Sequence, residues 1–116
     1  MFVFAIETCG RTVAFTKEVD RIMLEGFLSG ERDEGQHLLD GLSLMRDHKG
    51  KLWDGKAPIT ARLATASEEL DYDMTAAEYM EKEPGVRTDE SILMFSLVNT
   101  KGENVLMIPP AMRLVA

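Results

Sequence analysis

Three segments of the chain place a short turn between two apolar runs, a pattern that predicts three β-hairpins. Each turn has an acid or amide, two further residues and then glycine: Glu7 to Gly10, Asp47 to Gly50 and Asn99 to Gly102. Asp or Asn can cap such a turn with its side chain, and glycine can adopt the positive φ that the turn requires. The flanking runs, such as FVFAI and ILMFSLV, are rich in residues that favour strands.

The middle hairpin competes with a helix. Leu38, Leu42 and Met45 have helical spacing, so they could lie on one helix. Gly41 weakens that helix, and the turn that follows favours a strand beginning near Leu42. The pattern therefore favours a hairpin over residues 42–54 preceded by a short helix, and the longer helix remains the alternative.

Capping signals predict further helices. Thr16 is a candidate N-cap for a helix in the first third of the chain. Thr65 and Thr75 each precede a glutamate by three residues, which is capping-box spacing and predicts two short helices, the second of which ends at Pro84. Apolar and polar residues alternate over 58–64, which predicts a half-buried strand before these helices.

These elements predict one α+β domain over residues 1–116, with a mainly antiparallel sheet of hairpins and three to four short helices packed on one face. The segment 91–98 is apolar at nearly every position, so both of its faces need burial. So few helices are not expected to cover both faces. The pattern therefore predicts a homodimer through a face or an edge of the sheet.

Composition agrees with one globular domain, since 45% of the 116 residues are hydrophobic and 28% are charged. The single cysteine, Cys9, excludes an internal disulfide and is compatible with a reducing compartment. The apolar start MFVFAIE has no basic flank and is too short for a signal peptide or a membrane span. We therefore expect a cytoplasmic protein that does not bind membranes.

The net charge of −7 is concentrated in one stretch. Residues 68–90 contain nine acidic and two basic residues, whereas residues 46–62 contain five basic and two acidic ones. An acidic chain is not expected to bind nucleic acid directly, because the phosphate backbone repels it. The two oppositely charged segments could instead face each other across the two-fold axis of a homodimer.

Four acidic residues are the predicted partner-binding residues of the first stretch: Asp71, Asp73, Glu78 and Glu81. Carboxylates that stand in solvent on capped helices create a negative potential, which attracts a basic protein. The leading hypothesis is therefore a small non-catalytic module that binds a macromolecular partner through an acidic helical surface. Alternatives for the same residues are ordinary solvated helix faces, or imitation of nucleic-acid phosphates by an inhibitor of phage or plasmid origin.

The same stretch contains two patterns that are similar to metal-binding motifs. Asp71-Tyr-Asp73-Met-Thr75 resembles the D-x-D-x-T motif of haloacid-dehalogenase-like phosphotransferases, in which the first Asp follows a buried strand, but here a helix start precedes it. An EF-hand loop that began at Asp71 would need glycine at Ala76 and glutamate at Lys82. We therefore predict no metal site and no cofactor.

Trp53 lies among lysines, of which Lys51 and Lys56 are the nearest. Tryptophan is enriched at the centres of protein interfaces, although it also fills gaps at the edge of a core. These three residues complete the predicted partner-binding set, and they are a weak signal for nucleic acid on an acidic protein.

Candidates for catalysis are few. His37 lies three residues from both Glu34 and Asp40, which could orient its imidazole as a general base. This spacing gives the alternative of a small enzyme or ligand-binding protein with a pocket near His37. The chain contains none of the common nucleotide-binding or hydrolase motifs, so we assign no catalytic residue and favour a protein that is not an enzyme.

Overall fold

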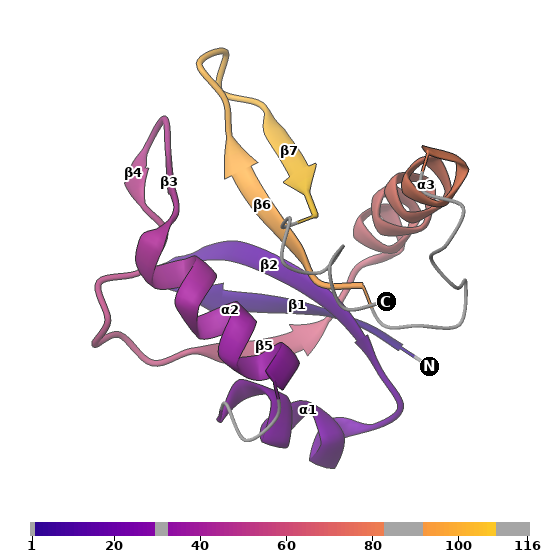
Figure 1. Ribbon diagram of the computed structural model, residues 1–116, viewed down its shortest axis with the longest axis horizontal. Coiled ribbons are helices and arrows are strands. Elements are labelled where there is room, and N and C mark those ends of the chain that lie inside the picture. Colours follow the sequence, from indigo (N-terminus) through magenta and orange to yellow (C-terminus); the bar gives the residue numbers. More distant parts are fainter. Residues whose placement is uncertain (1, 30–32, 83–91, 109–116) are drawn as a thin grey trace.

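The computed structural model describes residues 2–29, 33–82 and 92–108, with the backbone alone for Met23, Asp33 and Glu34. This part of the chain has an α+β fold with three helices, as the sequence predicts (Figure 1). The predicted helix end at Pro84 lies outside the described residues. The elements in chain order are β1 (Phe2–Thr8), β2 (Arg11–Glu18), α1 (Arg21–Leu28), α2 (Asp33–Leu44), β3 (Arg46–Asp47), β4 (Gly50–Lys51), β5 (Thr60–Leu63), α3 (Ala66–Lys82), β6 (Met94–Val98) and β7 (Asn104–Met107).

Five strands form an antiparallel sheet in the order β5-β1-β2-β6-β7. The first and third predicted hairpins are β1–β2 and β6–β7, and the predicted strand before α3 is β5. The inner strands are apolar at successive positions because side chains on both faces of the sheet are buried.

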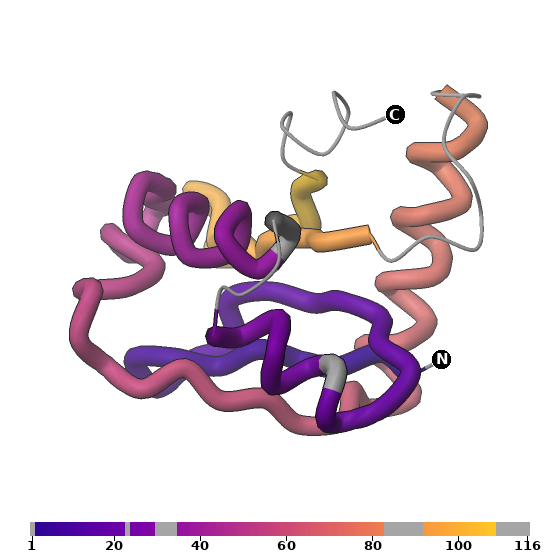
Figure 2. Tube along the Cα trace, turned by 60° about the horizontal axis from the view of Figure 1, so that its bottom comes forward, coloured from indigo at the N-terminus to yellow at the C-terminus, as the bar shows by residue number. Residues whose placement is uncertain are grey.

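The helices divide between the two faces of the sheet, which corrects the prediction that they all cover one face. Helices α1 and α2 pack on one face, and α3 packs on the other (Figures 1 and 2). The α1/α2 core contains Phe4, Ile6, Val13, Ala14, Leu24, Phe27, Leu38, Leu42, Leu52, Leu93 and Phe95. The α3 core contains Val3, Ala5, Phe15, Tyr72, Ala76, Tyr79, Ile92, Met94 and Ile108.

Both faces of β6 are buried within a single chain. Phe95 contributes to the α1/α2 core, and Met94 contributes to the α3 core. The start of the segment is also tied to α3, because the Tyr72 hydroxyl donates to the C=O of Ile92 at 2.6 Å and accepts its N–H at 3.1 Å. This segment therefore needs no second subunit to cover it, which removes the reason for which the sequence predicted a homodimer.

The hairpin predicted over residues 42–54 is confirmed only over residues 46–51, and the strand predicted to begin near Leu42 is wrong. Helix α2 continues to Leu44, and the hairpin that follows pairs only two residues on each side. Leu38 and Leu42 are both fully buried against the sheet, which explains why the helix extends past Gly41. A Cβ at Gly41 would lie 2.3 Å from the ring of Phe95, so glycine allows α2 to approach β6 closely.

Two of the predicted caps also differ from the structure. Thr16 lies within β2 opposite Phe4 and is 1% exposed, and α1 begins only at Arg21. Thr75 lies inside α3, which is one helix of 17 residues instead of two short ones. Tyr72, before Thr75, and Ala76 and Tyr79, after it, are buried on the same side of α3. This continuous buried side keeps α3 as one helix.

The predicted turn chemistry holds for the second and third turns. The side chains of Asp47 and Asn99 accept backbone N–H groups of their turns, from Lys49 at 2.9 Å and from Lys101 at 3.0 Å. The first turn is shorter, because Cys9 and Gly10 alone connect β1 to β2 with φ of 53° and 76°. None of the described helices combines the length and apolar character needed to cross a membrane.

Candidate functional site

Helix α3 carries an exposed apolar ridge on the side that faces away from the sheet. Leu70 and Met74 lie one helical turn apart and are 59% and 56% exposed. Ala77 is also exposed and lies next to Met74 on the same side of the helix. We refer to Leu70, Met74 and Ala77 as the α3 ridge.

Predicted partner-binding acids border this ridge. Asp71, Glu78 and Glu81 are exposed, and helical geometry places the first two on one flank and Glu81 at the C-terminal end. Asp73 lies on the other flank, where its carboxylate forms an ion pair with Lys17 of β2 at 3.2 Å. The sequence therefore predicted exposure correctly for these four residues, but not the pairing of Asp73 within the chain.

Another acid of the stretch is tied to the sheet. Glu68 forms a two-point ion pair with Arg62 of β5, with contacts of 2.7 and 2.9 Å, and completes a capping box with Thr65 through reciprocal bonds of 2.9 and 3.2 Å. The bond from Arg62 and the N–H of Thr65 hold the pKa of Glu68 at about 2. The two oppositely charged sequence segments thus meet within one chain at Arg62 and Glu68.

The basic members of the predicted set lie elsewhere. Lys51 is exposed on β4, and Lys56 is exposed in the following loop. The half-buried Trp53 packs at the edge of the α1/α2 core, and its indole Nε1–H donates to the C=O of Ala57 at 2.9 Å. The hairpin and loop that carry these residues are at the opposite end of the sheet from α3 (Figure 1). They therefore do not form one surface with the acids of α3.

A buried ion pair that the sequence did not predict organises that opposite end. The Asp47 side chain is 1% exposed and binds the Arg11 guanidinium at 2.5 Å. It also accepts the N–H of Val98 at 2.7 Å, while the N–H of His48 donates to the C=O of Val98 at 3.0 Å. The bond from Arg11, with backbone bonds from Val98 and Lys49, holds the pKa of Asp47 at about 2.

A cleft opens where β2 and β6 diverge. In the described residues these strands pair only at Ala14–Phe95 and Phe15–Met94. Val13 is an extra residue relative to β1, and such a bulge bends its strand away from its neighbour. Beyond this point the C=O of Ser96 accepts a hydrogen bond from the Arg11 side chain at 3.4 Å.

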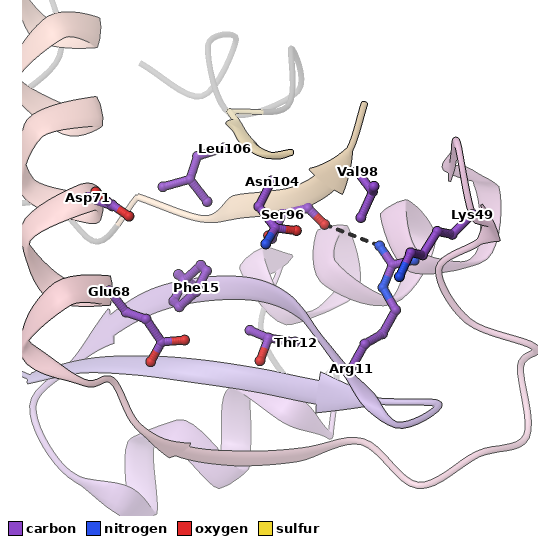
Figure 3. A pocket seen from close by; sticks show the side chains of 10 residues that line it. All are labelled: Arg11, Thr12, Phe15, Lys49, Glu68, Asp71, Ser96, Val98, Asn104 and Leu106. Atoms are coloured by element: carbon purple, nitrogen blue, oxygen red, sulfur yellow. Dashed lines mark hydrogen bonds between the residues drawn. The ribbon is translucent and has the colours of Figure 1, made fainter. Parts of the chain in front are cut away.

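This β2–β6 cleft has a volume of about 370 Å³. Its walls come from β2, from the β6–β7 hairpin, from the first turns of α3 and from the turn after β3 (Figure 3). Side chains of both charges and several apolar groups point toward it. It is lined by Arg11, Thr12, Phe15, Lys49, Glu68, Asp71, Ser96, Val98, Asn104 and Leu106.

Among the described side chains, His37 and Asp40 do not form a catalytic pair, and the side chain of Glu34 lies outside the described part of the chain. His37 is half-buried, its Nδ1 has no hydrogen-bond partner, and it lines neither the β2–β6 cleft nor a second, shallower pocket beside Cys9. Asp40 accepts a hydrogen bond from Gln36 at 2.9 Å. In the described ranges no three His, Cys, Asp or Glu side chains lie close enough to hold a metal ion.

Comparison with known proteins gave no match. No protein-family model, no curated protein and no solved structure matches this chain. The α3 ridge with its bordering carboxylates and the β2–β6 cleft are candidate binding surfaces of this chain.

Proposed function

We propose that this protein is a non-catalytic interaction module that binds a basic segment of a partner protein through the α3 ridge and its acidic border. The observation that carries the proposal is the exposure of Leu70 and Met74, side by side, on a helix whose inner side already covers the sheet. Single exposed apolar residues are common on protein surfaces, but adjacent ones with charged neighbours are typical of docking sites.

Each part of this surface has a distinct physical role in the proposal. Burial of Leu70 and Met74 against the partner supplies affinity, since apolar contact is the main favourable term in association. The carboxylates of Asp71, Glu78 and Glu81 select lysine and arginine on the partner and accelerate the encounter. Asp73 exchanges its pairing with Lys17 for a partner cation or keeps it, and therefore contributes less.

Two alternatives use the same or neighbouring residues. Imitation of nucleic-acid phosphates would need the carboxylates alone, and the apolar ridge between them favours a protein partner instead. Contact through Trp53, Lys51 and Lys56 would form a second, separate surface and remains a prediction. We place the protein in the cytoplasm, with which its exposed single thiol at Cys9 is compatible.

Affinity capture from the native host with the tagged full chain tests the proposal. The test variant carries Glu78→Lys and Glu81→Lys, and a matched control carries Glu25→Lys and Glu103→Lys, which change two exposed acids on other elements. Both variants alter the net charge equally. We expect the wild type and the control to capture the same partner protein, in smaller amounts at high salt. The test variant should capture at least tenfold less of that partner.

Thermal unfolding of all three proteins separates loss of binding from loss of fold. A variant with Met74→Ser, measured with the partner so identified, tests the apolar part. Equal capture by the wild type and the α3 variant, or equal loss in both variants, would contradict the proposal.

A further inference from the structure

The β2–β6 cleft carries opposite charges at its two ends. Asp71 and Glu68 project into it from α3, whereas Lys49 and Arg11 lie at the far end, beside the β3–β4 turn (Figure 3). Glu68 and Arg11 are already committed to ion pairs inside the chain. Asp71 and Lys49 are exposed, and among the described residues neither has an ion pair. One free anion and one free cation therefore face each other along the cleft.

The middle of the cleft combines apolar and hydrogen-bonding groups. Phe15 and Leu106 offer apolar surface, whereas the hydroxyl of Ser96 and the amide of Asn104 can donate and accept hydrogen bonds. The Thr12 hydroxyl already donates to Glu7 and accepts from Arg62, both at 3.3 Å. Such a mixture suits a ligand whose backbone is polar and whose side groups are small and apolar. The cleft does not suit a purely aliphatic ligand, because the polar groups of the cleft would then be buried without hydrogen-bond partners.

The length of the cleft limits the size of the ligand. Thr12 and Phe15, which line it along β2, are three residues apart, so they are separated by at most roughly 10 Å at the rise of a regular strand, since the bulge at Val13 shortens the rise. An extended chain of three residues spans about the same distance between its ends. The volume of about 370 Å³ lies near the lower end for small-molecule sites.

We propose that the β2–β6 cleft binds a short zwitterionic peptide of about three residues in extended form. Its ammonium group pairs with Asp71, and its carboxylate pairs with Lys49. This site is distinct from the α3 ridge, although Asp71 borders both. The proposal therefore goes beyond the function proposed above and does not depend on it.

Titration of the full chain with trialanine, followed by calorimetry and by backbone amide NMR shifts, tests the proposal. N-acetyl-trialanine and trialanine amide each lack one terminal charge, and dialanine is too short to reach both ends. We expect trialanine to bind and to shift the amides of Thr12 and Phe15. Each of the three other peptides should bind at least fivefold more weakly, because it loses one charged contact.

Two substitutions identify which end binds which charge. Lys49→Met should weaken the binding of trialanine at least fivefold but leave the affinity for trialanine amide unchanged. Asp71→Asn should also weaken the binding of trialanine at least fivefold, but it should leave the affinity for N-acetyl-trialanine unchanged. Lys51→Met and Glu78→Gln, which change exposed charges outside the cleft, should leave all affinities unchanged. Lys49→Met should also leave capture through α3 intact, so the two proposals can fail separately.

Three results would overturn the peptide proposal. They are absence of binding at millimolar trialanine, equal affinities for free and capped peptides, and equal effects of Lys49→Met on trialanine and its amide. Amide shifts confined to residues outside the cleft would count against it in the same way.

Discussion

The ring of Phe95 on β6 occupies the place that a Cβ at Gly41 of α2 would need. The added carbon would stand 2.3 Å from the ring Cζ, which is far inside van der Waals contact. Phe95 is fully buried in the α1/α2 core, so the ring has little room to move away. Helix α2 and the sheet are therefore in contact through a backbone position that tolerates no side chain.

Gly41→Ala should destabilise the protein, although alanine favours helices over glycine by about 1 kcal/mol. We expect a net loss of about 1–3 kcal/mol in the free energy of unfolding, as for other overpacked cores, measured by urea denaturation. Ser43→Ala, at an exposed position of the same helix, is the control and should change the stability by less than about 0.5 kcal/mol. A Gly41→Ala variant as stable as the wild type would show that α2 does not press on Phe95.

Acid should remove the contribution of the Asp47 ion pair to stability. The pKa of Asp47 falls from 3.8 to about 2 on folding, so its charged form favours the folded state. This contribution, about 2 kcal/mol, is fully present above about pH 5 and is lost as the pH falls through about 2. In Asp47→Asn the free energy of unfolding should be lower at neutral pH, and its difference from the wild type should shrink over that range.

Asp40→Asn, at an exposed carboxylate of α2, serves as the matched control for the acid titration. Its stability should follow that of the wild type from pH 7 to pH 2. If Asp47→Asn kept the full acid dependence of the wild type between pH 4 and pH 2, the pair with Arg11 would not be its source.

The predicted homodimer should form through the β5 edge of the sheet. This strand pairs only with β1, and it carries Leu63, which is 57% exposed and shares a face with Phe2, also 57% exposed. Light scattering after size-exclusion chromatography should then give twice the 13.0 kDa of the chain. Leu63→Asp should restore the monomer, because it places a charge at the joined edges.

Val105→Asp provides the control for the β5 edge, since Val105 is an exposed apolar residue of β7, at the opposite edge of the described sheet. The dimer should survive that change. A wild-type protein that stays monomeric at high micromolar concentration and low salt would contradict the homodimer prediction.

Local signals predicted the parts of the fold that depend on neighbours in sequence. The capping box at Thr65 and the turn capped by Asn99 form with the hydrogen bonds that their spacing implies. The extent of α2 could not be predicted in this way. The cost of glycine at position 41 is visible in the sequence, but the close approach of Phe95, 54 positions later, is not.

The candidate site also combines features that local sequence predicts with features that depend on distant contacts. Exposure of Glu78 and Glu81 follows from helical periodicity, so the sequence was sufficient for the acidic surface. The β2–β6 cleft depends on the pairing of Asp47 with Arg11, 36 positions apart, and on the bulge at Val13. The residues around Asp47 are those of an ordinary turn, so its local sequence does not indicate the ion pair. Its role depends on contacts that exist only after the chain has folded.

Hydrogen bonds at both ends of the ILMFSLV segment have a consequence for colloidal behaviour. A run of this kind, apolar and uncharged, is the type of sequence that joins cross-β aggregates when its backbone is free. At Ile92 the Tyr72 hydroxyl takes up both backbone groups, and at Val98 Asp47 and His48 do so. A strand from another molecule therefore finds no free backbone donor or acceptor at Ile92 or at Val98. The most aggregation-prone segment of this chain is protected at both ends by hydrogen bonds within the chain.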